Sequence, residues 1–461
     1  MPVLFITYFL QFMDKQILSL SSVFGIVQAT HLQGEEYSVI GSVAPIAQMA
    51  LQPLSAYFLV KFKLSIYIPV LVMCWGSTLA CMAAARNFPG LLVSRFFLGG
   101  FETSTQAAFI LVGQMWYKRH EQGLRLTIWY SNVGWVNIIG SLIMYGFGHI
   151  TNGAIHSYQI AFVVLGLLTL LWGIASFFVF PDNPVQSKFL TRDEKVIAVE
   201  RIRANQQGVE TKIFKWKQVL ETLLDLKSWC WMSLLLLHAI PAGAINIFGP
   251  LIVRGFGYDG YDVMLFLIPY GALQVICMVG SYWLSTKVQY KSPLVVVFLI
   301  PCIVGMTILY ITGRAEADQP ALLVAYYLLS ASSAVAPAML GWQAINTAGH
   351  TKKASIGPLL FEPKDGPFYH SGILACIICY SGAAALAVFT TAYLYYLNKK
   401  NEARRVEAGK AAKIVDYSMT TSEVKDTTPG VADKEEPQPV IGRRAFEDLT
   451  DLQNDEFIYV L

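Results

Sequence analysis

The sequence predicts an all-α polytopic membrane protein whose helices form two bundles. Three observations carry this prediction. Charged residues make up only 14% of the chain, apolar runs of membrane-spanning length recur along it, and one long polar insert divides those runs into two sets. Soluble domains carry roughly 25% charged residues. Because so few charges are available for a water-facing surface, lipid must cover much of the protein.

Apolar runs of about 20 residues, long enough to cross a bilayer as a helix, occur eleven times. The first begins almost at Met1, but it contains Asp14 and Lys15 and no small-residue cleavage site follows it. We therefore interpret it as a spanning helix and not as a signal peptide. The predicted spans are 3–26, 37–60, 65–85, 88–116, 126–150, 158–180, 229–253, 263–285, 294–312, 321–342 and 372–397.

The polar insert after the sixth span sets the domain organisation. We predict a first six-helix bundle (1–180), a cytosolic linker (181–228), a shorter second bundle (229–397) and a cytosolic tail (398–461). In the linker, Thr191 and Glu194 have the spacing of a capping box, and the residues at 195–205 predict an amphipathic helix on the membrane surface. The tail is charged and polar, so we expect disorder until its last residues, 455–461.

The distribution of basic residues predicts the orientation. Lysines and arginines gather after the even-numbered spans, which places those loops and the N-terminus in the cytosol. By the same rule the last of eleven spans ends outside, yet Lys399, Lys400, Arg404 and Arg405 follow it. A twelfth span near Ser355 would restore the alternation. The residues at 354–370 are too few and too polar to supply that crossing.

Composition and motifs exclude several classes of function. The net charge of +3 argues against a nucleic-acid partner, and all seven cysteines lie in apolar stretches, so no disulfide framework or C-x-x-C metal or redox site is expected. Gly255, Gly257 and Gly260 match a dinucleotide motif, but they join two spans instead of following a strand. We also find no Walker sequence and no catalytic triad, metal-ligand set or carboxylate dyad at helical spacing. We expect neither an enzyme nor a cofactor.

Ionisable residues inside spans are costly, so each is a functional candidate. Asp14 and Lys15 lie near the middle of the first span, unless that helix ends early and the two charges reach out to the membrane surface. Arg95, Glu102 and Gln106 are seven and four residues apart, so in one continuous helix they share a face within about 20°. Arg95 also suits a structural ion pair that braces two helices.

Buried polar neutral residues are the second group of candidates. We select Tyr130, Asn246 and Gln274 as substrate contacts, and Asn246 is favoured because Pro241 and Pro250 flank it and loosen the helix. Most such residues only join helix to helix, and His238 fits a packing role better than a proton relay. The remaining polar candidates are Gln11, Asn132, Asn137, Gln343 and Asn346.

Five stretches carry a family resemblance: FLQFMDK (9–15), RFFLGGFE (95–102), WYKRHEQGLR (116–125), PDNPVQSKFLTRDEK (181–195) and DLTDLQNDEFIYVL (448–461). Together they resemble the major facilitator superfamily, within it the anion:cation symporters, and most closely the fungal allantoate permease group. The resemblance implies a twelve-helix, two-bundle transporter that works by alternating access, with substrate near the midplane between the bundles.

The resemblance also implies residue roles. Asp14 and Glu102 would be protonatable, Lys15 would hold the substrate carboxylate, and Arg95 would engage Asp14. Lys15 departs from the arginine that many relatives have, and lysine holds a carboxylate without a bidentate fork. Relatives also carry an extension before the first span and an extra helix near the position of Ser355.

The sequence therefore predicts a proton-coupled importer of a small organic anion such as allantoate, nicotinate, pantothenate or a related carboxylate. We expect a monomer in the plasma membrane whose partners are the anion, protons and the lipid bilayer. The alternative is a transport-inactive relative or a membrane nutrient receptor, which the missing helix and short start favour.

Overall fold

The computed structural model describes residues 2–33, 36–150, 155–180, 190–202, 216–288, 291–313, 318–347, 369–407, 450–454 and 457–461. Within these ranges the regular elements are all helical. In chain order they are α1 (Pro2–Val23), α2 (Ile26–Ala29), α3 (Glu36–Lys61), α4 (Leu64–Met82), α5 (Phe88–Glu102), α6 (Thr105–Trp116), α7 (Arg119–Tyr130), α8 (Asn132–Gly148), α9 (Ser157–Val179), α10 (Arg192–Ile202), α11 (Trp216–Leu224), α12 (Leu226–Arg254), α13 (Gly260–Lys287), α14 (Ser292–Ile311), α15 (Gln319–Leu328), the 3₁₀ helix η3 (Leu329–Ala331), α16 (Ser332–Ile345) and α18 (Tyr369–Glu407).

Each predicted span corresponds to one element or to one adjacent set. Among the described residues, eight helical segments are long and apolar enough to cross a membrane, counting α15, η3 and α16 together. The other three predicted spans are α1, the pair α5 and α6, and the pair α7 and α8. The all-α, membrane-spanning fold class predicted from hydropathy is therefore confirmed.

The fourth span is not one continuous helix. It breaks after Glu102, and α6 begins at Thr105. The Thr103 hydroxyl donates to the Gly99 carbonyl at 2.9 Å, a type of contact that often bends helices. The prediction that Arg95, Glu102 and Gln106 share one face assumed an unbroken helix, and Gln106 follows the break, so for this residue it stays a prediction.

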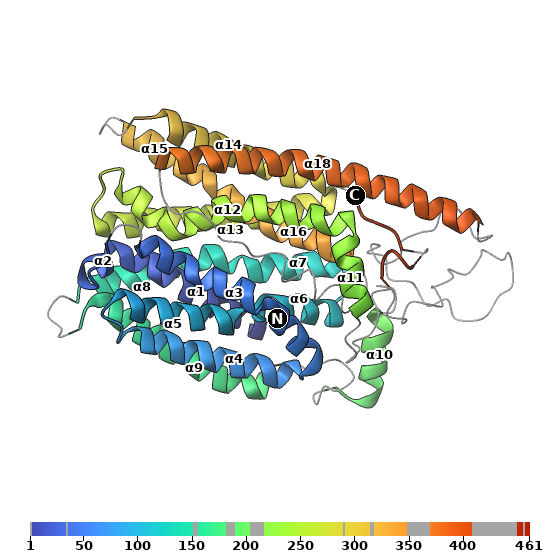
Figure 1. Ribbon diagram of the computed structural model, residues 1–461, viewed down its shortest axis with the longest axis horizontal. Helices are drawn as coiled ribbons and strands as arrows, with labels where there is room; N and C mark the ends of the chain where they lie inside the picture. Colours follow the sequence, from blue (N-terminus) through green and yellow to red (C-terminus); the bar gives the residue numbers. More distant parts are fainter. Residues whose placement is uncertain are drawn as a thin grey trace.

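The helices form two groups that lie side by side (Figure 1). Helices α1 to α9 make the first group and α12 to α18 the second, while α10 and α11 lie across one end. Helix pairs that join the groups include α8 on α13, α1 on α12, and α7 on both α16 and α13. Large aliphatic and aromatic side chains remain exposed on the outward faces of both groups, as expected for surfaces that contact lipid.

Two glycines allow α8 and α13 to approach closely between the groups. A Cβ atom placed on Gly134 would lie 2.6 Å from the Gly271 carbonyl oxygen, and one placed on Gly271 would lie 2.6 Å from the Gly134 oxygen. Both contacts are with backbone atoms, which cannot move aside by a rotamer change. Any side chain here must therefore push the two helices apart.

We expect Gly134→Val to destabilise the protein by about 1–3 kcal/mol, because it overpacks this contact. Thermal unfolding of the purified protein in detergent measures the effect. Gly146→Ala is the matched control, because Gly146 lies on the same helix and a Cβ there meets no atom within 4 Å. If Gly134→Val unfolded at the same temperature as Gly146→Ala, the close approach would not limit packing.

The linker contains the predicted helix and one that the sequence analysis missed. Glu194 Oε2 accepts from the Thr191 backbone at 2.8 Å and from its hydroxyl at 2.9 Å, which confirms the capping contact at the start of α10. These bonds hold the pKa of Glu194 below its usual value. Val196 and Ile197 are exposed, so the described protein does not cover the apolar side of α10. The missed helix is α11, which leads into α12.

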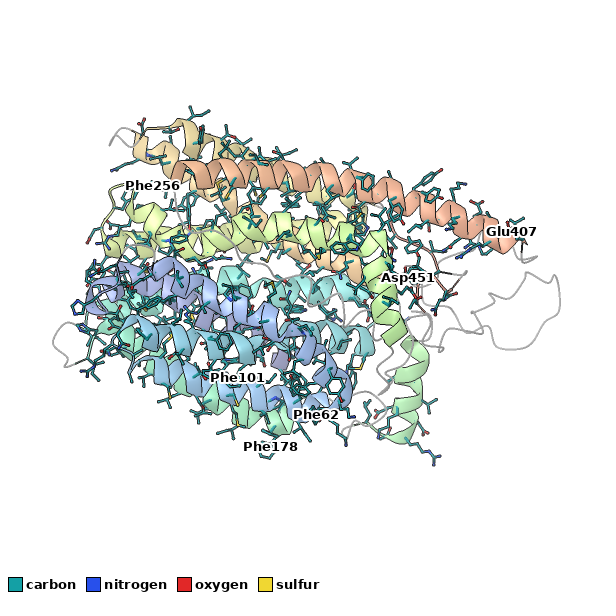
Figure 2. All side chains as sticks on the ribbon, in the orientation of Figure 1. Phe62, Phe101, Phe178, Phe256, Glu407 and Asp451 are labelled. Carbon is teal, nitrogen blue, oxygen red and sulfur yellow. The ribbon has the colours of Figure 1, made fainter. Side chains whose placement is uncertain are left out.

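The last helix runs in the direction that the alternation of spans requires. Figure 1 shows α18 starting near α15 and running toward the end where α10 and α11 lie. Glu407 and Asp451 lie at that end, whereas Phe256, just after α12, lies at the other (Figure 2). The basic exit of α18 therefore shares an end with the beginning of α12. The predicted gap near Ser355 lies outside the described residues.

Residues 450–454 and 457–461, near the end of the chain, form a packed terminal segment. Asn346, just after α16, donates to the Val460 carbonyl at 2.8 Å and accepts from its N–H at 2.6 Å. Asn398 of α18 makes the same two-way contact with Tyr459, at 2.9 Å in each direction. The sequence predicts order only from residue 455, whereas the packed contacts begin at Thr450, which is fully buried.

A buried ion pair anchors the terminal segment. Lys227, at the start of α12, pairs with Asp451, and both side chains are fully buried. The Lys227 ammonium also donates to the Asn346 carbonyl at 3.1 Å, and the Tyr459 hydroxyl donates to Asp451 Oδ2 at 3.0 Å. Burial, reinforced by the Asp451 carboxylate, raises the pKa of Tyr459. The segment thus joins α12, α16 and α18 at one end of the second group.

Candidate functional site

The centre of the candidate site is an ion pair between α1 and α5. Lys15 Nζ lies 3.2 Å from Glu102 Oε2, and Gln48 Nε2 of α3 donates to the same oxygen at 3.1 Å. The Lys15 side chain is 36% exposed and that of Glu102 only 1%. The Lys15 side chain is thus partly exposed, whereas the Glu102 carboxylate that holds it is buried.

Asp14 and Arg95 are also buried, but they are not paired with each other. Both Asp14 carboxyl oxygens and the Arg95 Nε lack a hydrogen-bond partner among the described residues. Consecutive residues on a helix point about 100° apart, so Asp14 and Lys15 face different neighbours. The resemblance implies an ion pair between Arg95 and Asp14, whereas here Lys15 holds Glu102. Arg95 acts on both acids only at longer range.

Gln106 and Tyr130 meet on the opposite side of the break in the fourth span. Gln106 Nε2 donates to the Tyr130 hydroxyl at 2.6 Å. The Tyr130 ring packs against Tyr8 of α1, with 5.5 Å between ring centroids, and against Trp129. The structure therefore brings these two predicted residues together beside α1.

Gln274 takes part in a chain of amides that crosses between the groups. Gln16 Nε2 of α1 donates to Asn137 Oδ1 at 3.1 Å, and Asn137 Nδ2 donates to Gln274 Oε1 at 2.7 Å. Gln274 is buried on α13, so this chain links both groups where α8 packs on α13. Such amide hydrogen bonds can change partners when the two helix groups move relative to each other.

Asn246 does not join the other candidates. It is exposed on α12, which continues without interruption through Pro241 and Pro250, so the prolines do not open the helix there. Buried positions on this part of α12 include Pro241, Ile245, Gly249 and Pro250. No described contact places Asn246 near Lys15 or Glu102.

The sequence analysis missed several polar residues around the acids. Gln48 holds Glu102, Gln16 begins the amide chain, and Trp75 and Thr169 lie near Asp14. Gln48 and Gln52 are four residues apart in an otherwise apolar span, a signal that could have identified them. Nothing in the local sequence marks Trp75 or Thr169, because both residue types are common in spans.

A cavity of about 460 Å³ opens elsewhere between the groups, at the end that holds the terminal segment. Thr127 of α7, Ser281 of α13, Trp342 of α16 and Val460 are among its lining residues. None of the predicted site residues lines it. The candidate site therefore consists of the buried polar residues and not of this cavity.

These groups suit binding and proton exchange. A half-exposed ammonium can hold an anion, and two buried acids can each carry a proton. The part of the chain that the structure describes contains no group of three metal-ligating side chains. The arrangement places a cation of α1 beside a carboxylate of α5 within the membrane-spanning part of the protein.

Comparison with known proteins identifies the family of the chain. The Major Facilitator Superfamily profile matches residues 4–357. The chain is 33% identical to an uncharacterized transporter of Schizosaccharomyces pombe, over 100% of this chain and 85% of the relative. It is 30% identical to the thiamine pathway transporter of Saccharomyces cerevisiae (100% and 84% covered) and 27% identical to the allantoate permease of the same yeast (100% and 84%).

Solved structures show the same fold. The proton:xylose symporter XylE, bound to 6-bromo-6-deoxy-D-glucose, superposes with a TM-score of 0.64 at 12% identity, covering 86% of this chain and 94% of XylE. The human organic anion transporter MFSD10 superposes with a TM-score of 0.53 at 12% identity, covering 84% and 97%. With its helices in two groups and a profile match over most of its length, the chain belongs to the major facilitator superfamily.

Proposed function

We propose that the protein is a proton-coupled importer of a small organic anion such as allantoate, nicotinate, pantothenate or a related carboxylate. One observation carries the proposal: the half-exposed Lys15 ammonium is paired with the buried carboxylate of Glu102. The similarity to a yeast allantoate permease supports an anionic substrate. Membership of a transporter family supports transport of a small molecule and not catalysis.

The geometry supports coupling by competition for Lys15. When Glu102 takes up a proton, it no longer neutralises Lys15, and an unpaired cation inside a span is costly until an anion arrives. The substrate carboxylate thus binds best when Glu102 is protonated. By thermodynamic linkage the bound anion raises the proton affinity by the same factor, so anion and proton are carried together.

We propose roles in substrate and proton binding for the remaining predicted residues. Gln106, Tyr130 and Gln274 supply amide and hydroxyl groups for the polar parts of the substrate, and Asp14 carries a second proton. Asn246 is the weakest of these assignments, because no described contact joins it to the rest. The basic residues at one end support a cytosolic N-terminus and tail, and we propose a monomer in the plasma membrane.

Uptake by purified protein in liposomes tests the function. Radiolabelled allantoate, nicotinate, pantothenate and thiamine are compared with and without an inward proton gradient. We expect accumulation of at least one carboxylate, with the gradient required and thiamine not accumulated. Saturable substrate binding without uptake would support the nutrient-receptor alternative, and uptake independent of the gradient would reject proton coupling.

We expect Lys15→Ala to weaken anion binding by about 10- to 100-fold, the loss of one charge-assisted contact. Lys15→Arg should retain binding, because it keeps the cation. Lys61→Ala is the control, since Lys61 lies at the end of α3 over the Tyr57 ring. Isothermal titration in detergent measures the affinity. Binding of Lys15→Ala at wild-type affinity would move the anion site to Arg95.

A further inference from the structure

The Asp14 side of α1 faces the interior of the first group, away from Lys15. Trp172 Nε1 of α9 donates to the Thr7 hydroxyl of α1 at 2.9 Å, two turns before Asp14. Helix α4 packs closely on α9, since a Cβ on Gly76 would lie 3.1 Å from the Thr169 carbonyl carbon. The three helices α1, α4 and α9 therefore meet around Asp14.

Four polar atoms at this meeting point are buried and unmatched. Asp14 Oδ1 and Oδ2, the Trp75 indole N–H and the Thr169 hydroxyl lack a hydrogen-bond partner among the described residues. All three side chains are 0% exposed. Trp75 and Thr169 are close enough to act on the Asp14 carboxyl, but neither reaches hydrogen-bond geometry. Buried polar groups are normally bonded, so four unmatched atoms together need an explanation.

The unmatched groups are complementary. A carboxylate is acceptor-only and needs donors, whereas an indole offers one donor and no acceptor, and a threonine hydroxyl can donate. An ionised carboxylate without donors is very costly in this environment, so the arrangement seen here suits a protonated Asp14. The donors that an ionised Asp14 needs thus lie beside it, on Trp75 and Thr169.

We propose that Trp75 and Thr169 are positioning residues that receive the Asp14 carboxylate when it releases its proton. This inference rests on the proposed function, in which Asp14 carries a proton. Trp75 and Thr169 do not touch the substrate. They act through Asp14, and they separate a sealed proton site from the Lys15 and Glu102 pair where the anion binds.

The charged groups that act on Asp14 do not replace these donors. Glu102 and Arg95, both on α5, interact with the Asp14 carboxyl electrostatically and with opposite sign. Helices α4 and α9 contribute only the neutral groups of Trp75 and Thr169. Because Glu102 is itself an acid, the test is carried out in a background that lacks it.

Infrared difference spectroscopy of the purified Glu102→Gln protein follows the carbonyl band of a protonated carboxyl as pH changes. The band that Asp14→Asn removes belongs to Asp14. Without Trp75 or Thr169 the carboxylate loses a donor, so proton release should require a higher pH. We expect Trp75→Phe and Thr169→Val each to raise the midpoint by about 1 pH unit.

The controls are Trp172, three residues from Thr169 on α9, and Thr7, seven residues from Asp14 on α1. Trp172→Phe and Thr7→Val remove the hydrogen bond between α9 and α1 without touching Asp14, and should leave the midpoint unchanged. Thr169→Ser keeps the hydroxyl and should restore the wild-type midpoint. Unchanged midpoints in Trp75→Phe and Thr169→Val, or an Asp14 band that never titrates, would overturn the proposal. Failure of the proposed function is measured separately, as the absence of gradient-dependent uptake by the wild-type protein while the Asp14 band still titrates.

Discussion

Replacing Glu102 by glutamine is expected to abolish accumulation of the anion against its gradient while leaving exchange of anion across the membrane intact. Glutamine has nearly the shape of glutamate but releases no proton. Lys15, which Glu102 holds at 3.2 Å, is then open to the substrate in every state. Each net positive charge that enters at 100 mV contributes about 2.3 kcal/mol, or about a 50-fold gradient, and the variant should lose this accumulation.

The measurement compares net uptake with counterflow in liposomes under an imposed proton gradient. Glu121→Gln is the control, because Glu121 caps the start of α7 outside the site, where it accepts from the Lys118 backbone at 3.3 Å. That variant should accumulate anion normally. Wild-type accumulation by Glu102→Gln would remove Glu102 from the coupling mechanism and leave Asp14 as the proton carrier.

Replacing Asp451 by alanine is expected to cost up to about 3–5 kcal/mol of stability, because the buried Lys227 ammonium loses the carboxylate that holds it and keeps, among the described residues, only that of Asp225, whose Oδ2 lies 3.8 Å away. Both side chains are fully buried, and the Tyr459 hydroxyl loses the Asp451 carboxylate as acceptor and keeps only the Asp451 backbone carbonyl at 3.3 Å. The terminal segment should then detach from α12, α16 and α18. The fall in thermal unfolding midpoint in detergent and faster proteolysis of the tail measure the two effects.

An exposed ion pair near the same end provides the control. Lys399 and Glu402 of α18 lie 2.9 Å apart, but their side chains are 57% and 28% exposed. Glu402→Ala should therefore cost no more than about 1 kcal/mol. The double variant Lys227→Met with Asp451→Leu should recover part of the loss, since it removes the buried charge. Equal effects of Asp451→Ala and Glu402→Ala would show that the terminal segment does not brace the second group.

The amino-acid sequence by itself determined the class of fold, the positions of the spans, and which basic loops lie at the same end of the helices. Hydropathy reports how each stretch of about 20 residues partitions into lipid, which is a local property, and all eleven predicted spans have counterparts in the structure. Because basic loops follow alternate spans, α18 was required to end on the same side as the other basic loops, and it does. Asp14, Lys15, Arg95 and Glu102 were also selected correctly as buried or partly buried charges, because ionisable residues in apolar runs are rare.

Only the tertiary structure decided which of these charges meet. Asp14 and Lys15 are adjacent, so a rotation of α1 by about 100° would exchange their neighbours, and packing alone sets that rotation. The break after Glu102, between α5 and α6, was not predicted from the sequence either. The pairs Lys227 with Asp451 and Asn346 with Val460 join residues more than a hundred positions apart, which no local pattern reports. Partition into lipid depends on composition, whereas pairing depends on helix rotation and contact, and these exist only in the folded chain.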